Sequence, residues 1–186
     1  MCYSIKNKER GFTLIELLIA MTIGLVILAA LSSTFLMQRK TYDVQEQIVE
    51  MVQNARAAMD IITREIRMGG YNPAGASFNG ITYSASQLQI KADLDGDGNT
   101  TGSYEDITYS YDATNFQIDR NIGGGNQPFA ENIQAFTFSY LDGSGVTTTT
   151  TSNIRQIKIT ITARTADPGH TDYALTSLIT PRNLAF

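Results

Sequence analysis

The hydrophobic pattern divides the chain into an apolar run, an amphipathic stretch and a long segment of alternating positions. Residues 12–37 contain a single charged side chain, that of Glu16. A run of about 18 apolar residues is long enough to cross a bilayer as a helix, and a helix pairs its own backbone polar groups in lipid. The pattern therefore predicts a transmembrane or filament-core helix over residues 12–37.

Beyond residue 37 the pattern takes on the period of an amphipathic helix. No proline or glycine interrupts it before Gly69-Gly70, and Pro73 follows. Glycine and proline at such positions end helices, so one helix is predicted over residues 13–68, and residues 38–70 carry it into a second domain. The apolar positions of its second half, at spacings of three and four, are Ile48, Val52, Ala55, Met59, Ile62 and Ile66.

After Gly70 the period changes to the two-residue period of strands. Alternation is clearest at residues 107–111, 136–140 and 157–161, and a last strand is expected over residues 173–180. Short strands with turn signals such as Asp142-Gly143 favour an antiparallel sheet with one covered face. Exposed loops are expected over residues 71–86, with a candidate short strand at 81–83, and over residues 121–130. The predicted fold class is α+β: a long N-terminal helix whose second half packs on one antiparallel sheet of a β-rich head domain, residues 71–186.

Charge and composition exclude several classes of function. The chain has 14 basic and 18 acidic residues and a net charge of −4, which argues against nucleic acid as the main partner. Its single cysteine, Cys2, excludes a disulfide framework. The lone histidine, His170, is expected to be a solvated turn residue. No arrangement of serine, cysteine or acidic residues suggests catalysis, so an enzyme is not expected.

The junction before the apolar run carries a recognisable motif. A short basic leader ends at Arg10-Gly11, and a carboxylate within a membrane segment is costly, so that Glu16 marks function. The segment resembles the processing site of type IV pilins and pseudopilins; it reads Lys8-Glu9-Arg10-Gly11-Phe12-Thr13-Leu14-Ile15-Glu16-Leu17. A secretory signal peptide or a plain membrane anchor would leave Glu16 unexplained, and the apolar run is too long for a signal peptide.

The resemblance implies a processing pathway and a set of partners. Prepilin peptidase would cut between Gly11 and Phe12 on the cytoplasmic side, which makes residues 1–11 a leader, and Phe12 would then be N-methylated. Glu16 would pair with the Phe12 amine of a neighbouring subunit during assembly. The implied location is the inner membrane, with the leader cytoplasmic and the head periplasmic, and then a filament at the cell surface.

Looser matches at residues 65–73, 131–141 and 182–184 resemble PilW-type minor pilins and J-type pseudopilins, and a PilW-type minor pilin is the prediction. They imply a structural subunit that helps to prime or assemble a type IV pilus, together with other minor and major pilins and the inner-membrane assembly platform. A J-type pseudopilin of a type II secretion system is an alternative. A tip adhesin or ligand-binding module is an alternative of another class.

One loop has the beginning of a calcium-binding pattern. Residues 93–99 place oxygen ligands at alternate positions with glycine at the sixth, as calcium loops do. The twelfth position holds Tyr104, and Glu105 lies one residue later. The segment therefore predicts either a polar hairpin loop or a structural Ca²⁺. The ligands of that ion would be Asp93, Asp95, Asp97, Asn99 and Glu105.

Overall fold

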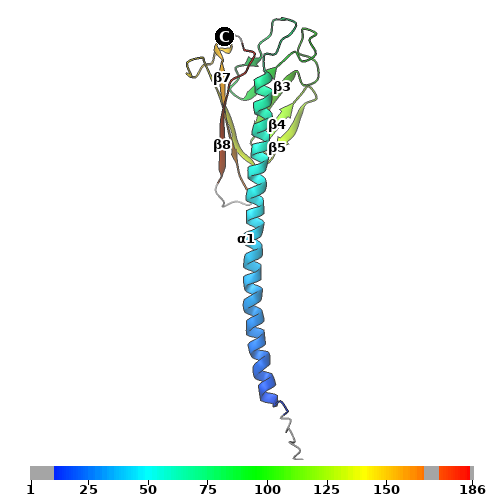
Figure 1. The fold of residues 1–186 in the computed structure, drawn as a ribbon, viewed down its shortest axis with the longest axis vertical. Coiled ribbons are helices and arrows are strands. Elements are labelled where there is room, and N and C mark those ends of the chain that lie inside the picture. Colours follow the sequence, from blue (N-terminus) through cyan, green and yellow to red (C-terminus); the bar gives the residue numbers. More distant parts are fainter. Residues whose placement is uncertain (1–10, 166–171, 185–186) are drawn as a thin grey trace, which may run out of the picture. The chain divides into compact units, whose positions relative to one another are not determined.

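The computed structural model describes residues 11–165 and 172–184. The predicted position of His170, and residues 1–10 of the predicted leader, therefore lie outside the described residues. The chain divides after Glu46 into two compact units. One helix, α1 (Leu14–Met68), contributes to both units and has 55 residues, which confirms the predicted long helix (Figure 1).

In the first unit, α1 buries almost none of its apolar side chains. Every residue over 12–37 except Gly24 is exposed, and Phe12 and Met37 are 85% and 76% exposed. Apolar surface in contact with water is unfavourable in proportion to its area. This part of the helix therefore needs a cover from outside the chain, either lipid or other protein.

In the second unit, α1 contributes one stripe to a common core. Its buried residues are Met51, Ala55, Ala58, Met59, Ile62 and Ile66. The stripe is rotated slightly from the predicted one, because Met51 and Ala58 join it while Ile48 is exposed and Val52 only partly buried.

The second unit contains two antiparallel sheets. The first has the order β1-β2-β3-β4-β5 and the second the order β6-β7-β8. The strands of the first are β1 (Ile81–Thr82), β2 (Gln87–Lys91), β3 (Asp106–Asp112), β4 (Gln117–Asn121) and β5 (Asn126–Ala130). The strands of the second are β6 (Ile133–Leu141), β7 (Gln156–Ala163) and β8 (Tyr173–Ile179), and a short 3₁₀ helix, η1 (Thr151–Asn153), precedes β7.

The expectation of a single sheet is therefore wrong, and the break has a local cause. Between β5 and β6 the chain passes through Asn132, whose φ of 59° is left-handed. Asparagine tolerates this conformation better than most residues. The turn directs β6 away from β5, and the amide of Ile133 donates instead to the carbonyl of Phe116 at 2.8 Å.

The expectation of a loop over residues 121–130 is also wrong in part. Residues 126–130 form β5, which pairs with β4 at the edge of the first sheet. Proline is compatible with an edge strand because the missing N–H removes no bond that the sheet needs, and Pro128 occupies such a position.

The core lies where α1 meets both sheets. In Figure 1 the last turns of α1 lie between β7 and β8 on one side and β3, β4 and β5 on the other. Ile62 and Ile66 of α1, Tyr109 of β3 and Ile159 of β7 are all fully buried in one hydrophobic cluster. The α+β architecture is thus confirmed, with two sheets in place of one.

Candidate functional site

The start of α1 is closed by a reciprocal pair of hydrogen bonds. The Glu16 carboxylate oxygen Oε2 accepts from the Thr13 amide at 3.0 Å and from the Thr13 hydroxyl at 2.8 Å. The Glu16 amide in turn donates to the Thr13 hydroxyl at 3.3 Å. This is a capping box, which satisfies backbone N–H groups that a helix start leaves unpaired. Its T-x-x-E signal is present in the sequence, although the prediction for Glu16 was only a contact with a neighbouring subunit.

These contacts leave part of the Glu16 carboxylate available. Both hydrogen bonds that the carboxylate accepts from Thr13 use Oε2, and within residues 11–165 and 172–184 no hydrogen bond to Oε1 is seen. A carboxylate oxygen can accept more than one hydrogen bond. Glu16 can therefore hold its own helix start and accept a cationic donor from outside the chain at the same time.

The predicted cleavage site lies directly before this cap. Gly11 and Phe12 are exposed and precede the first helical residue. A Cβ added to Gly11 would meet no atom within 4 Å. Packing among the described residues therefore does not require a glycine here.

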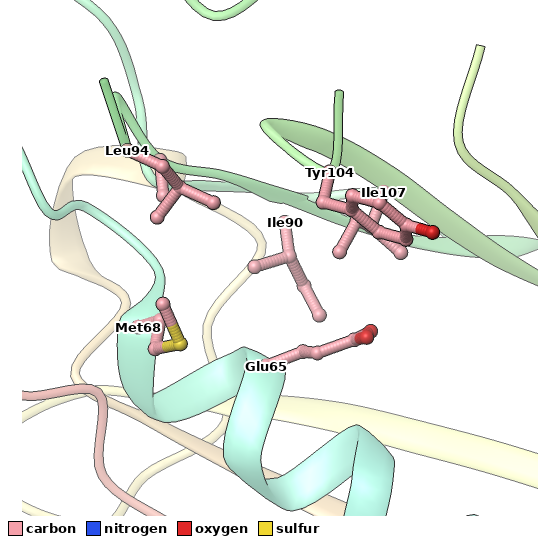
Figure 2. Close-up of a pocket in the computed structure, with 7 residues that line it drawn as sticks. Glu65, Met68, Ile90, Leu94, Tyr104 and Ile107 are labelled. Carbon is pink, nitrogen blue, oxygen red and sulfur yellow. The ribbon is translucent and has the colours of Figure 1, made fainter. Parts of the chain in front are cut away.

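A second polar cluster, which the sequence reading missed, ties the end of α1 to the first sheet. The Arg120 guanidinium of β4 donates to Glu65 of α1 at 2.6 Å, and the Tyr109 hydroxyl donates to the other Glu65 oxygen. Arg120 Nε lies 3.2 Å from the Tyr109 hydroxyl, and its guanidinium stacks over the Tyr104 ring at 5.4 Å. In Figure 2 the Glu65 side chain extends from α1 beneath Ile90, so that its carboxylate lies on the side of Tyr104 and Ile107.

Burial makes this cluster electrostatically distinctive. Burial and the Glu65 carboxylate raise the pKa of the Tyr109 hydroxyl, so the phenol stays protonated. Burial opposes the charge on Arg120, but hydrogen bonds and charge attraction from Glu65 outweigh it and raise the pKa of the guanidinium. The cluster is thus an ion pair with a neutral hydroxyl donor. Its geometry suits fixing the helix end against β3 and β4, and it offers no free acid or base.

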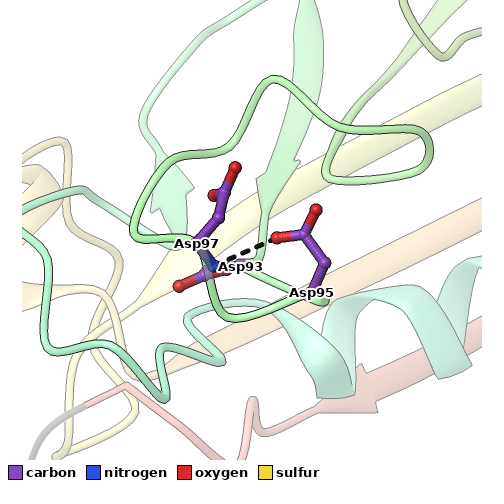
Figure 3. A group of neighbouring side chains, drawn as sticks. All are labelled: Asp93, Asp95 and Asp97. Atoms are coloured by element: carbon purple, nitrogen blue, oxygen red, sulfur yellow. Dashed lines mark hydrogen bonds between the residues drawn. The ribbon is translucent and has the colours of Figure 1, made fainter.

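The loop between β2 and β3 gathers the predicted calcium ligands. One carboxylate oxygen from each of Asp93, Asp95 and Asp97 lies within 4.8 Å of the other two (Figure 3). Two oxygens bound to one calcium ion lie no more than about 5 Å apart, given Ca–O distances of about 2.4 Å. The spacing of the three aspartates is therefore compatible with one shared ion, and the calcium site stays a prediction.

The remaining predicted ligands, like the three aspartates, already accept hydrogen bonds from amides of the loop. Glu105 is almost fully buried; its Oε1 accepts from the amides of Leu94 at 2.7 Å and Asp95 at 3.2 Å, and its Oε2 from the amide of Gly102 at 2.7 Å. A Cβ at Gly102 would lie 2.5 Å from that oxygen, so the close approach needs glycine. The Asn99 side-chain oxygen accepts from the Thr101 amide at 2.7 Å. The Glu105 carboxylate therefore closes the loop, a role that the sequence pattern did not indicate.

Comparison with known proteins bears on the start of the chain. Residues 6–32 match the family model described as "Prokaryotic N-terminal methylation motif". The matched residues include Gly11, Phe12 and Glu16. A search of curated proteins found no match.

This match supports a type IV pilin-like or pseudopilin-like protein. The motif belongs to structural proteins, and it implies processing by prepilin peptidase and assembly with other pilins. Within the described residues, α1 is the helix that is long and apolar enough to cross a membrane, and none of the residues in its most apolar stretch is buried. The motif and the helix together fit membrane anchoring.

Proposed function

We propose that this chain is a minor pilin, a structural subunit that helps to prime or assemble a type IV pilus. Prepilin peptidase cleaves it between Gly11 and Phe12, and Phe12 is N-methylated. The observation that carries the proposal is the apolar segment over residues 12–37, exposed at every residue but Gly24, together with the methylation motif matched over residues 6–32. Lipid covers this helix first, with the leader cytoplasmic and the head periplasmic, and other pilin helices cover it in the filament.

Glu16 sets the register between subunits in this proposal. Cleavage frees an α-amine at Phe12, which is cationic at neutral pH. A carboxylate surrounded by apolar helices needs a charged or hydrogen-bonding partner. Thr13 supplies part of that need within the chain, and the Phe12 amine of the neighbouring subunit supplies the countercharge.

A J-type pseudopilin of a type II secretion system is the second candidate, because the same motif serves both machines. The segments at residues 65–73, 131–141 and 182–184 resemble both kinds of subunit, so an experiment has to separate the two machines. Deleting the chain's gene distinguishes the two: a minor pilin is required for surface pili, and a pseudopilin for release of secreted proteins.

The intact mass and N-terminal sequence of the membrane-extracted protein test the processing step. We expect a chain that begins at Phe12 and is heavier than the unmodified peptide by one CH₂ group. A chain that begins near Thr34 would indicate a secretory signal and would contradict the proposal, as would an uncut chain that begins at Met1.

A further inference from the structure

A groove at the C-terminal end of α1 contains an apolar socket. The socket is a cavity of about 150 Å³, lined by Met68 of α1 and by Ile90, Leu94, Tyr104 and Ile107 of β2, β3 and the loop between them (Figure 2). Its inner wall is buried, whereas its rim is open to solvent: Met68 is 47% exposed and Tyr104 53%. A cavity of about this size in another protein holds a benzene ring. The socket therefore suits one apolar side chain.

The single ionised group in the socket wall is already neutralised. Glu65 lines the cavity, but Arg120 and Tyr109 hold both of its oxygens. A cation that entered the socket would compete with Arg120 for this carboxylate. The socket thus favours an uncharged occupant.

A wider basic shelf adjoins the socket. It is a hollow of about 810 Å³ that shares Met68 and Leu94 with the socket and is also lined by Arg64, Arg67, Tyr71 and Arg182. Arg64 pairs with Asp60 at 3.5 Å. Arg67 and Arg182 are exposed, and in the part of the chain that the structure describes neither side chain has an ion pair.

The two unpaired arginines are held on a fixed backbone. The Arg182 amide donates to the Arg67 carbonyl at 3.2 Å, which ties the last described segment to the last turn of α1. Asn183 adds a bond from its side chain to the Met68 carbonyl at 3.4 Å. The whole chain has a net charge of −4, so this cationic patch is a local feature rather than part of a basic surface.

We propose that the socket and the shelf together, called here the arginine groove, bind an acidic segment of a partner protein. That segment inserts one apolar side chain beside Met68 and Tyr104 and places carboxylates against Arg67 and Arg182. The planar guanidinium binds carboxylates with two parallel hydrogen bonds, and arginine, tyrosine and methionine are the residue types enriched at protein interfaces. The inference goes beyond the proposed function, because it specifies the chemistry of a partner for the head and holds whichever machine assembles the chain.

Binding of a labelled peptide tests the proposal. The probe is fluorescein-labelled Glu-Asp-Phe-Asp-Glu with blocked ends, and its anisotropy is followed as the full processed chain in zwitterionic detergent micelles is added. We expect saturable binding that weakens as salt is raised. Replacing phenylalanine in the probe by glycine should weaken binding about tenfold, the effect of removing one large apolar side chain from a pocket.

Charge reversal in the protein tests the shelf separately. The variant Arg67→Glu/Arg182→Glu should bind the probe about tenfold more weakly, whereas Arg39→Glu/Lys158→Glu, which makes the same change in net charge at other exposed sites, should bind it normally. Circular dichroism of both variants checks that the fold is retained.

Several outcomes would overturn the arginine groove. One is that the probe binds the protein no better than it binds empty micelles. Another is that both charge-reversal variants lose affinity for the probe equally. A third is that replacing the phenylalanine of the probe leaves its affinity unchanged. Tighter binding of a labelled single-stranded DNA than of the peptide would assign the two arginines to phosphate recognition instead. None of these outcomes bears on cleavage at Gly11, so failure here is distinguishable from failure of the proposed function.

Discussion

The residue whose role is most sharply defined in the head is Arg120. Its ion pair with Glu65 is about four-fifths buried on both sides, with side-chain exposures of 19% and 16%. Removing one partner of such a pair leaves the other charge buried without compensation. We therefore expect Arg120→Met to lower the free energy of unfolding by about 3 kcal/mol, measured by urea titration with tyrosine fluorescence as the probe of the head.

Two further variants show whether the charge is the cause. Arg64→Met removes an exposed ion pair of α1 and should cost less than about 1 kcal/mol. Glu65→Gln added to Arg120→Met removes the stranded carboxylate while keeping an acceptor for the Tyr109 hydroxyl, so part of the lost stability should return. Equal losses for Arg120→Met and Arg64→Met would show that the Glu65 pair is no more than a surface contact.

The Tyr140 hydroxyl should make the free energy of unfolding depend on pH in the alkaline range. Burial raises the pKa of its hydroxyl to about 12, above the ordinary value of 10.0. A group whose pKa is raised on folding contributes stability that is fully present below its unfolded pKa and is lost as pH rises toward the folded value. The free energy of unfolding should thus decline between about pH 10 and about pH 12 as unfolded tyrosine ionises.

The variant Tyr140→Phe isolates this contribution. It removes a hydroxyl that donates to the Gln87 carbonyl at 3.3 Å, which should cost about 1 kcal/mol at neutral pH. Above pH 10 the variant should lose stability less steeply than the wild type, while Tyr109, whose pKa is also raised, continues to contribute in both proteins. Parallel pH profiles in urea titrations would argue against the role of Tyr140.

Among the helices and strands, the sequence predicted those that carry a regular hydrophobic period. The helix stripe and the alternating isoleucines of β7 are strong periodic signals, and both elements formed where expected. The strand β5 was missed because Asn-Gln-Pro-Phe-Ala does not alternate; it is a strand through its pairing with β4. The separation into two sheets depends on the left-handed Asn132, whose conformation no period indicates.

The candidate sites also divide into those that a local sequence pattern indicates and those that depend on the fold. The Thr13–Glu16 cap joins residues three positions apart, so its pattern can be read from the sequence. Glu65 and Arg120 are separated by 55 positions, and only the packing of α1 on β4 brings them together. Glu105 was proposed as a calcium ligand, but its neighbours also make it the acceptor for three loop amides, which depends on the fold of the loop.

The calcium site in the loop between β2 and β3 stays a prediction, which a melting-temperature measurement can test. Calcium that binds only the folded loop should raise the melting temperature by mass action. The rise should vanish in Asp95→Ala/Asp97→Ala. Asp93 is left intact because its two oxygens accept from the amides of Gly96 and Gly98 and so stabilise the loop without an ion.

Magnesium provides the control for this measurement. It demands a tighter octahedral geometry and keeps its water more strongly than calcium, so it should raise the melting temperature less. Differential scanning calorimetry of the full chain gives both values. A wild-type melting temperature that does not respond to calcium would leave a polar loop held by Asp93 and Glu105.

At the scale of the whole molecule, the two units have opposite relations to solvent. The second unit covers its apolar residues in a core of one helix and two sheets, whereas the first exposes nearly all of residues 12–37. When lipid or other helices cover this helix, its side chains lose contact with water. The Glu16 carboxylate then loses its hydration as well. Under the proposed function, the charge of Glu16 therefore matters most in the assembled state, where the Phe12 amine of another subunit supplies the countercharge.

The variant Glu16→Gln separates the two roles of this residue. Glutamine can replace glutamate in a capping box, so the cap with Thr13 should persist, and with it cleavage and membrane insertion. The variant has no negative charge, however, so it should not form an ion pair with the Phe12 amine of a neighbouring subunit. Incorporation into filaments, measured by immunoblot of sheared surface pili, should then fall to the level of Glu16→Val, which loses both cap and charge. Normal incorporation of Glu16→Gln alongside defective Glu16→Val would instead assign Glu16 to the cap of its own helix, and the register between subunits would have to rest on the packing of the apolar helices alone.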